Sequence, residues 1–99
     1  MAREVVVTRE AFVELLEEVN SIAAFDVAAA IELEQAFSAA LDAISENPKM
    51  YPIGVESASY QYRRFAIKSR VVVYTEVGDS VIVVRVFGPG EDWQSDLSG

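Results

Sequence analysis

The sequence predicts an α+β fold in which the order of elements is β-α-α-β-β-β, with a helical hairpin packed on an antiparallel sheet. Three observations lead to this prediction. The stretch from Tyr60 to Phe87 is dense in Val, Ile, Tyr and Phe, which suit the pleated, half-buried surface of a strand. Two long segments before it repeat apolar residues at three- and four-residue steps, which is typical of helices. With 99 residues, the chain is expected to be one domain, residues 1–99, with a single modest core.

The first strand and the first helix come from the N-terminal segment. Arg3 to Val7 is a short β-branched run, and we expect it to join the sheet. We expect Thr8 to be the N-cap residue of the helix that follows, because its hydroxyl can accept a hydrogen bond from a free N–H of the first turn. The apolar stripe of this helix is formed by Phe12, Leu15, Leu16, Val19, Ile22 and Ala23.

The second helix is expected to begin after Asp26, which caps it, and to end before Asn47-Pro48. Its apolar stripe is formed by Ala30, Leu33, Phe37, Ala40, Leu41 and Ile44. The short crossing between the two helices favours antiparallel neighbours that cover one side of the sheet. The segment from Lys49 to Ser59 is predicted to be a loop.

Three antiparallel strands are predicted at about residues 62–67, 70–77 and 80–87, with ends placed to within two to four residues. Lys68-Ser69 interrupts the first apolar run, and Gly78-Asp79 is typical of a two-residue hairpin turn. Gly88-Pro89-Gly90 then ends the last strand, because proline has no N–H for the ladder.

Arginines lie among the apolar residues of these strands. Side chains alternate between the two faces of a strand, so each strand divides into sets that share a face. We expect these sets to be Tyr62, Arg64 and Ala66; Arg63, Phe65 and Ile67; Arg70, Val72, Tyr74 and Glu76; and Val81, Val83, Arg85 and Phe87. Two interpretations follow: several guanidinium groups converge on one face, or they form a solvated face in which Arg85, for example, pairs with a carboxylate such as Glu76.

Composition excludes several kinds of chemistry. The chain has no Cys and no His, so it has no thiolate nucleophile, no imidazole base and no Cys/His zinc site. It also lacks an acidic calcium-loop motif, and we expect neither a metal nor a cofactor. No apolar run approaches the length of a membrane span, and there is no signal-peptide pattern, so we expect a cytoplasmic protein without a membrane partner.

The net charge of −8 is unevenly distributed along the chain. Residues 1–59 hold three basic and eleven acidic side chains, whereas residues 60–99 hold five of each. Neutralising phosphates requires a basic surface, so we expect no direct DNA binding by this chain alone. The ribosome, which is also a polyanion, should repel a protein of this charge.

The order and spacing of several motifs resemble the ParE/RelE toxin superfamily, and more closely its ParE, or plasmid-stabilisation, branch. The resemblance extends from about Val5 to Trp93. It depends on the predicted β-α-α-β-β-β order and on four motifs: Asn47-Pro48 with Tyr51-Pro52, Tyr62-Arg63-Arg64-Phe65, Val71-Val72-Val73-Tyr74, and Val83-Val84-Arg85-Val86. One departure is Phe87-Gly88, where ParE relatives often have a His after the last strand.

The resemblance implies a growth-inhibiting toxin of a bacterial type II toxin–antitoxin system. ParE-like members poison DNA gyrase, whereas RelE-like members cut mRNA on the ribosome, and a cognate antitoxin neutralises both. Toxins of the superfamily are commonly basic and their antitoxins acidic, but this chain is acidic. We expect a ParE-like gyrase inhibitor; the alternatives are a RelE-like endoribonuclease and a non-toxic homologue that only binds a partner protein.

Each alternative assigns its own residues. Target or partner contact is predicted for Tyr62, Arg63, Arg64, Arg85 and Trp93. If the chain is a nuclease, the catalytic residues are instead Arg64, Arg70, Tyr74 and Arg85, because RNA cleavage needs proton transfer and cations around the phosphate. Trp93, the one tryptophan, follows the last strand, where it either packs on the strands with Leu97 or contacts the target. In ParE-like toxins the C-terminal region is implicated in the action on gyrase.

Overall fold

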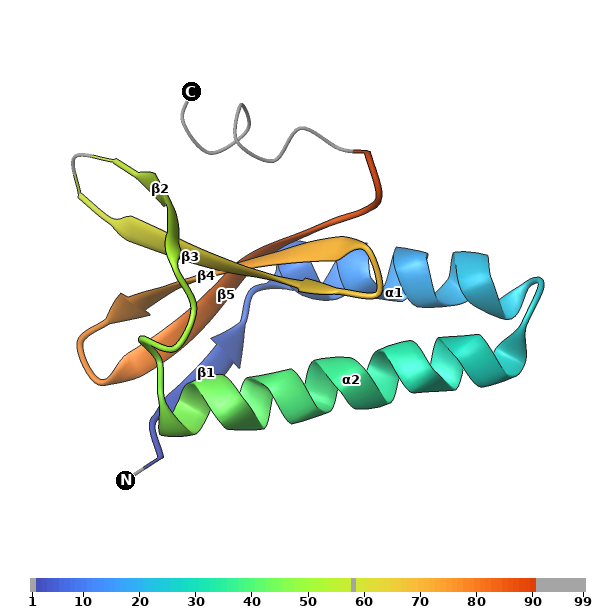
Figure 1. Cartoon of the computed structure of the whole chain (residues 1–99), viewed down its shortest axis with the longest axis horizontal. Coiled ribbons are helices and arrows are strands. Elements are labelled where there is room, and N and C mark those ends of the chain that lie inside the picture. The colour runs from blue at the N-terminus through green and yellow to red at the C-terminus, as the bar shows by residue number, and fades with distance from the viewer. Residues whose placement is uncertain (1, 58, 91–99) are drawn as a thin grey trace.

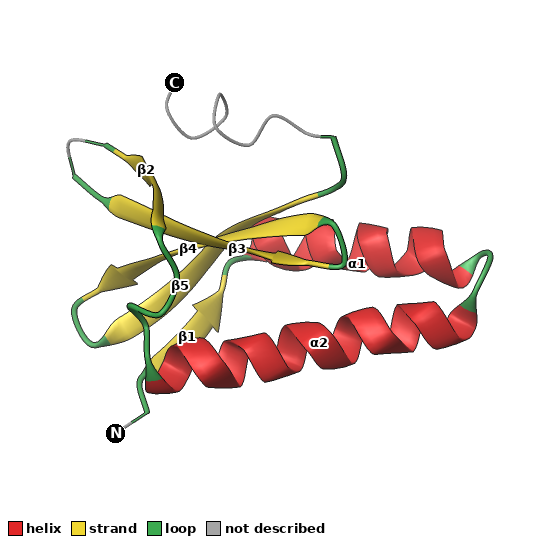
Figure 2. Cartoon of the chain, in the orientation of Figure 1, coloured by secondary structure: helices red, strands yellow, loops and turns green. Residues whose placement is uncertain are grey.

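The structure is a computed structural model that describes residues 2–57 and 59–90 of the chain. Its elements, in order, are β1 (Glu4–Val7), α1 (Arg9–Ala23), α2 (Val27–Glu46), β2 (Ile53–Glu56), β3 (Gln61–Ile67), β4 (Arg70–Val77) and β5 (Ser80–Phe87). The two helices form an antiparallel hairpin beside a twisted sheet, and the tip of the hairpin extends beyond the strands (Figures 1 and 2). The predicted α+β class is confirmed.

The strands form one sheet in the order β1-β5-β4-β3-β2. Strands β3, β4 and β5 pair antiparallel with one another, as predicted, and β2 pairs antiparallel with β3. However, β1 lies parallel to β5, so the sheet is mixed and the expectation of a wholly antiparallel sheet is wrong. Parallel neighbours need a long crossover connection, and the helical hairpin that follows β1 begins this connection.

Strand β2 was not expected, because the segment from Lys49 to Ser59 was predicted to be a loop. Its residues pair with the start of β3, where Val55 lies opposite Tyr62 and Glu56 opposite Gln61. A four-residue strand that contains a glycine has too short an alternation to be recognised from sequence. Its pairing with β3, a non-local interaction, makes it a strand.

Both predicted helix caps are confirmed. The Thr8 hydroxyl accepts a hydrogen bond from the Ala11 N–H at 3.2 Å and donates to the carbonyl of Val84 at 3.2 Å, so it also ties α1 to β5. The Asp26 carboxylate accepts from the Ala29 N–H at 3.1 Å. Each cap satisfies an N–H that the first turn of a helix leaves without an intrahelical partner. Neither α1 nor α2 combines the length and the apolar character that crossing a bilayer requires.

The core lies between the helical hairpin and one face of the sheet. On α1 it includes Ala11, which is completely buried, and Val19, with Leu15 packed against them. Phe12 and Leu16 were expected in this stripe but are 51% and 42% exposed, so that part of the prediction is wrong. The sheet contributes these buried residues: Phe65, Ile67, Val72, Tyr74, Val81, Val83 and Val86.

A β-bulge in β5 changes which residues face the core. Arg85 lies opposite Val73, and Val83 opposite Tyr74, so Val84 has no partner across the ladder. An extra residue of this kind shifts the alternation of side chains beyond it. Val86 therefore joins the core although it is an odd number of residues from Val83. The predicted shared face of Val81, Val83, Arg85 and Phe87 is wrong for this reason.

Candidate functional site

The strand arginines are divided between the two faces of the sheet. Arg85 binds acids at the start of α1, Arg70 binds an acid near the end of α1, and Arg63 binds the segment that follows α2. Arg64 alternates with Arg63 along β3 and lies on the opposite face of the sheet. Arg64 and Arg85 both lie opposite Val73, so these two share one face of the sheet, whereas Arg63 and Arg70 lie on the face of Tyr74. Two of the four guanidinium groups thus share a face, and the four do not form one site.

Arg85 is held by the acidic residues of α1. Its guanidinium donates from Nε to both carboxylate oxygens of Glu14, at 3.1 and 3.0 Å, and from Nη2 to Oε2 at 2.7 Å. Glu10 approaches Arg85 Nε at 2.8 Å, and the Phe87 ring lies 4.4 Å below the guanidinium carbon. Glu14 also accepts the Val86 N–H at 2.9 Å. The partner of Arg85 is thus Glu14 and not the suggested Glu76; a target contact by Arg85 stays a prediction.

Arg70 is bound at the far end of the same helix. Its Nε donates to Glu18 at 2.8 Å and its Nη1 to the carbonyl of Lys68 at 2.6 Å. The side chains of Arg70 and Glu18 are only 15% and 22% exposed, so the pair is largely removed from water. Ion pairs of this kind lose much more when one partner is removed than exposed pairs do. The contact fixes α1 on the sheet.

Arg63 and Tyr74 lie side by side in neighbouring strands. Arg63 donates to the carbonyl of Tyr51 at 2.7 Å and lies 3.9 Å from the carboxylate of Glu76. Lys49 reaches the same carboxylate at 3.1 Å. These contacts bind the segment after α2 to the sheet. The Tyr51 ring also stacks on Phe65 of β3, with ring centroids 4.6 Å apart, and so holds the same segment on the sheet.

Tyr74 is fully buried, and its hydroxyl donates to the carbonyl of Pro48 at 2.7 Å. Burial raises the pKa of Tyr74 to about 12, although the nearby Arg63 guanidinium lowers it in part. A general base works best when its pKa lies near the operating pH. Tyr74 is therefore a protonated structural residue at neutral pH, and its geometry does not suit the acid–base role considered for a nuclease.

The face of the sheet away from the helices has a different character. We call it the helix-free face and define it by the residues of its small hollow, which has a volume of about 180 Å³: Tyr60, Tyr62, Thr75, Val77, Ile82 and Val84. The Tyr60 and Tyr62 rings lie 6.1 Å apart between centroids. Thr75 is buried there and donates to the carbonyl of Gln61 at 2.9 Å. Among the predicted contact residues, Tyr62 lines this hollow, and Arg64 and Arg85, which both lie opposite Val73, are on the same side of the sheet.

Sequence reasoning missed most of this hollow. Tyr60, Val77 and Ile82 were assigned no role, although Tyr60 and Val77 are each 46% exposed. A signal was present, because β4 and β5 carry apolar residues at both alternating sets of positions. Strands of that kind are apolar on two faces. The described residues form two helices, and both lie on the other face, so the second apolar face points to a contact outside the core.

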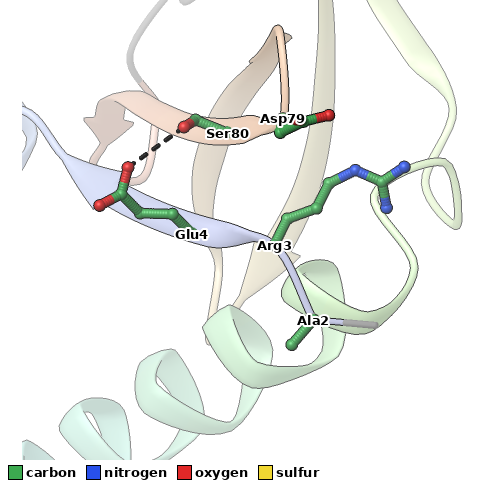
Figure 3. Close-up of a pocket in the computed structure, with 5 residues that line it drawn as sticks. All are labelled: Ala2, Arg3, Glu4, Asp79 and Ser80. Atoms are coloured by element: carbon green, nitrogen blue, oxygen red, sulfur yellow. Dashed lines mark hydrogen bonds between the residues drawn. The ribbon is translucent and has the colours of Figure 1, made fainter.

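A second depression lies at the sheet edge where β1 meets the β4–β5 turn (Figure 3). Ala2, Arg3, Glu4, Asp79 and Ser80 line it, and the Ser80 hydroxyl donates to Glu4 at 3.2 Å. Its polar, mixed-charge lining gives no specific chemistry. Within residues 2–57 and 59–90, no three acidic side chains gather in a way that would hold a metal ion.

Trp93 lies outside the described residues, so the structure does not test its predicted contact. The structure describes the other predicted contact residues, which are Tyr62, Arg63, Arg64 and Arg85. Arg63 and Arg85 belong to two separate networks of contacts within the fold. The proposed nuclease set is divided between the two faces of the sheet and the two ends of α1. The described residues therefore bring together an aromatic and aliphatic surface rather than a catalytic centre.

Comparison with known proteins gives a consistent result. The model of one family, described as "ParE toxin of type II toxin-antitoxin system, parDE", matches residues 5–93. A solved structure titled "Chromosomal ParDE TA system from P. aeruginosa" superposes with a TM-score of 0.72 at 10% identity, over 89% of this chain and 97% of that chain. At this identity the likeness shows the fold alone. Among curated proteins, a search finds no significant match.

Proposed function

This chain belongs to the ParE toxin family of type II toxin–antitoxin systems, and we propose that it inhibits growth by binding DNA gyrase until a cognate antitoxin neutralises it. The observation that supports this most directly is the internal use of the cationic residues. Arg63, Arg70 and Arg85 are bound to carboxylates or carbonyls within the fold. A toxin that acts by binding a protein needs no catalytic group.

The endoribonuclease alternative finds little support among the described residues. RNA cleavage requires a base for the 2′-hydroxyl, an acid for the leaving oxygen and cations for the phosphorane. Tyr74 has a pKa of about 12 and is buried, so it is neither a ready base nor accessible to RNA. Arg70 and Arg85 neutralise glutamates of α1 instead of facing a phosphate.

The charge of the chain favours a protein target over a nucleic acid. A net charge of −8 repels DNA and the ribosome at long range. We therefore propose contact with gyrase protein, with no direct DNA binding by this chain alone, in the cytoplasm. The helix-free face supplies a surface suited to this contact, because exposed aromatic residues contribute strongly to protein interfaces.

Growth and enzyme assays together test this proposal. The chain is expressed from an inducible promoter in a bacterial host, with and without the product of the adjacent gene, and the purified chain is added to gyrase supercoiling reactions. We expect growth arrest that the adjacent gene suppresses, and inhibition of supercoiling. Tyr62→Ala and Arg64→Ala should weaken inhibition, whereas Glu32→Gln, far from this face, should not. Arrest with intact gyrase activity and cleaved mRNA would support the endoribonuclease alternative, and normal growth would support the non-toxic homologue.

A further inference from the structure

Two apolar side chains on the side of the helix-free face are buried more completely than the sheet alone explains. Val73 and Phe87 are both 0% exposed, yet neither is part of the core cluster between the hairpin and the sheet. Val73 lies opposite Arg85, and Phe87 lies opposite Val71, so alternation places both on the side of the hollow. The Arg85 guanidinium lies over one face of the Phe87 ring. Complete burial indicates that a further segment covers this side of the sheet.

A row of positive charge borders the hollow on the side where β5 ends. Arg64 and Arg85 both lie opposite Val73, so they form one row across three neighbouring strands. Thr75 and Ile82, which line the hollow, lie opposite one another and nearer the β4–β5 turn. The chain leaves β5 beyond the row of arginines. A segment that turned back over this face would therefore pass the arginines before it reached the hollow.

The segment of sequence that follows the described part of the chain, residues 91–99, has a composition that matches this side of the sheet. It contains three acidic residues and no basic residue, and its large apolar residues are Trp93 and Leu97. Residues 9–46 of the helical hairpin contain nine acidic side chains and one arginine. Like charges repel, so an acidic segment is disfavoured next to the hairpin. The opposite side of the sheet, with its arginine row and apolar hollow, is the favoured position.

The chain after β5 is long enough to reach the hollow. The last residue of Gly88-Pro89-Gly90 has a φ of 84°, a left-handed conformation that suits a reversal of direction. Trp93 is three residues further on, which an extended chain spans in about 10 Å. The distance back along β5 from Phe87 to Val84 is also three residues, or about 10 Å. The acidic pair Glu91-Asp92 precedes Trp93, in the same order as the arginine row and the hollow.

We propose that residues 91–99 fold back over the helix-free face and place the Trp93 indole in the hollow, against Tyr62 and Val84. The hollow has a volume of about 180 Å³ and is lined mainly by aromatic and aliphatic side chains. An apolar cavity of about 150 Å³ is large enough to bind benzene, so this hollow suits a single aromatic side chain. The inference goes beyond the proposed function and does not depend on it, because it concerns the binding of the chain to its own C-terminal segment.

Charge fixes the direction of the segment on the sheet. Arg85 is already bound by two glutamates of α1, at 2.7 and 2.8 Å. Arg64 is therefore the arginine of the row that meets the carboxylates of Glu91 and Asp92. Charge pairs of this kind contribute orientation more than affinity. The apolar contact of Trp93 then supplies most of the binding energy, since aromatic side chains bury a large apolar area.

Tryptophan fluorescence of the full chain tests this inference, because Trp93 is the one tryptophan. We expect emission at a shorter wavelength than that of a free tryptophan amide, and a return to the free value in urea. Tyr62→Ala should shift the emission to longer wavelength and raise the rate of acrylamide quenching by at least about twofold, since the indole loses part of its cover. Phe12→Ala removes a half-exposed ring of α1 and should change neither value. Unshifted emission in the folded chain, or equal effects of the two substitutions, overturns the inference.

Charge reversal tests the orientation at an exposed position, where the fold tolerates substitution. Arg64→Glu should raise the quenching of Trp93, and adding Glu91→Lys with Asp92→Lys to the same chain should lower it again. Lys68→Glu makes the same change in net charge at another exposed position of the sheet and should leave quenching unchanged. Equal effects of Arg64→Glu and Lys68→Glu, or no rescue by the two lysines, contradict the proposed orientation.

Nuclear Overhauser effects in the full chain locate the indole directly. We expect cross-peaks between the indole protons of Trp93 and the methyl groups of Val84, at an intensity that does not change on dilution. Cross-peaks to Leu16 of α1 instead, or cross-peaks that disappear on dilution because a second copy supplies the segment, overturn the inference. These measurements need neither gyrase nor an antitoxin, so their outcome stands whether or not the chain inhibits growth.

Discussion

Replacing Glu14 by alanine removes four hydrogen bonds that join α1 to β5: three from the Arg85 guanidinium and one from the Val86 N–H. The side chains of Glu14 and Arg85 are 20% and 23% exposed, so water compensates for the loss only in part. Glu10 still faces Arg85, but the Val86 N–H loses its carboxylate acceptor. An orphaned donor and a partly buried unpaired charge together cost about 2–4 kcal/mol.

The assay is thermal unfolding followed by circular dichroism, together with urea titration. For a domain of this size, the expected loss lowers the melting temperature by roughly 10 °C or more. Glu14→Gln keeps a carbonyl acceptor and should cost only about 1 kcal/mol. Glu17→Ala, an exposed position three residues further along α1, serves as the control and should stay within about 0.5 kcal/mol of the unchanged chain.

A double-mutant cycle with Arg85→Ala isolates the pair. If the contact is as the distances indicate, Glu14→Ala costs much less in the Arg85→Ala background, with a coupling energy of about 1–3 kcal/mol. If Glu14→Ala and Glu17→Ala are equally stable, or if the cycle shows no coupling, then Arg85 is not held by α1. In that case Arg85 is available to contact a target.

Three other results follow from the structure. Tyr74→Phe should destabilise the fold by about 1 kcal/mol, since the carbonyl of Pro48 loses a buried donor, and should leave toxicity intact. Burial raises the pKa of Tyr74 to about 12, so the contribution of its neutral hydroxyl to stability is fully present below about pH 10, its unfolded value, and is lost as the pH rises to about 12. Alkaline unfolding should show that loss in the unchanged chain but not in Tyr74→Phe. Deleting residues 91–99 should abolish toxicity while the fold and antitoxin binding persist; a toxic deletion variant together with a harmless Arg70→Ala variant would support the nuclease alternative.

Local patterns predicted the elements whose signals lie in adjacent residues. The caps at Thr8 and Asp26 and the Gly78-Asp79 hairpin turn were each recognisable from a few residues, and the structure confirms them. The turn at Lys68-Ser69 is also confirmed, with positive φ values of 49° and 70° at two residues that are not glycine. Backbone of that kind suits the tight connection of two twisted antiparallel strands.

Interactions between segments distant in the sequence could not be predicted from local sequence patterns. The pairing of β2 with β3, the parallel contact of β1 with β5, and the bulge at Val84 all depend on register. The bulge matters most for the site, because one extra residue changes the phase of the alternation on which the grouping of Arg85 was based. The choice of Glu14 as its partner depends on how α1 lies on β5, which no periodicity in either segment specifies.

The amphipathic pattern of α1 shows a related limit. Periodicity placed Phe12 and Leu16 in the core because it identifies apolar positions and not the surface that covers them. In the structure, the helix turns Ala11 and Val19 inward and leaves Phe12 and Leu16 exposed. The apolar stripe of α1 is therefore wider than the contact that the core of this small fold makes with it.

Gyrase supercoiling measured with the purified chain tests the central proposal most directly. Relaxed plasmid, gyrase and ATP are incubated with increasing amounts of the chain, and a parallel cell-free translation reaction receives the same amounts. We expect that supercoiling stops, that the adjacent gene product restores it, and that translation of intact mRNA continues. Unchanged supercoiling together with cleaved mRNA in the translation reaction would contradict it.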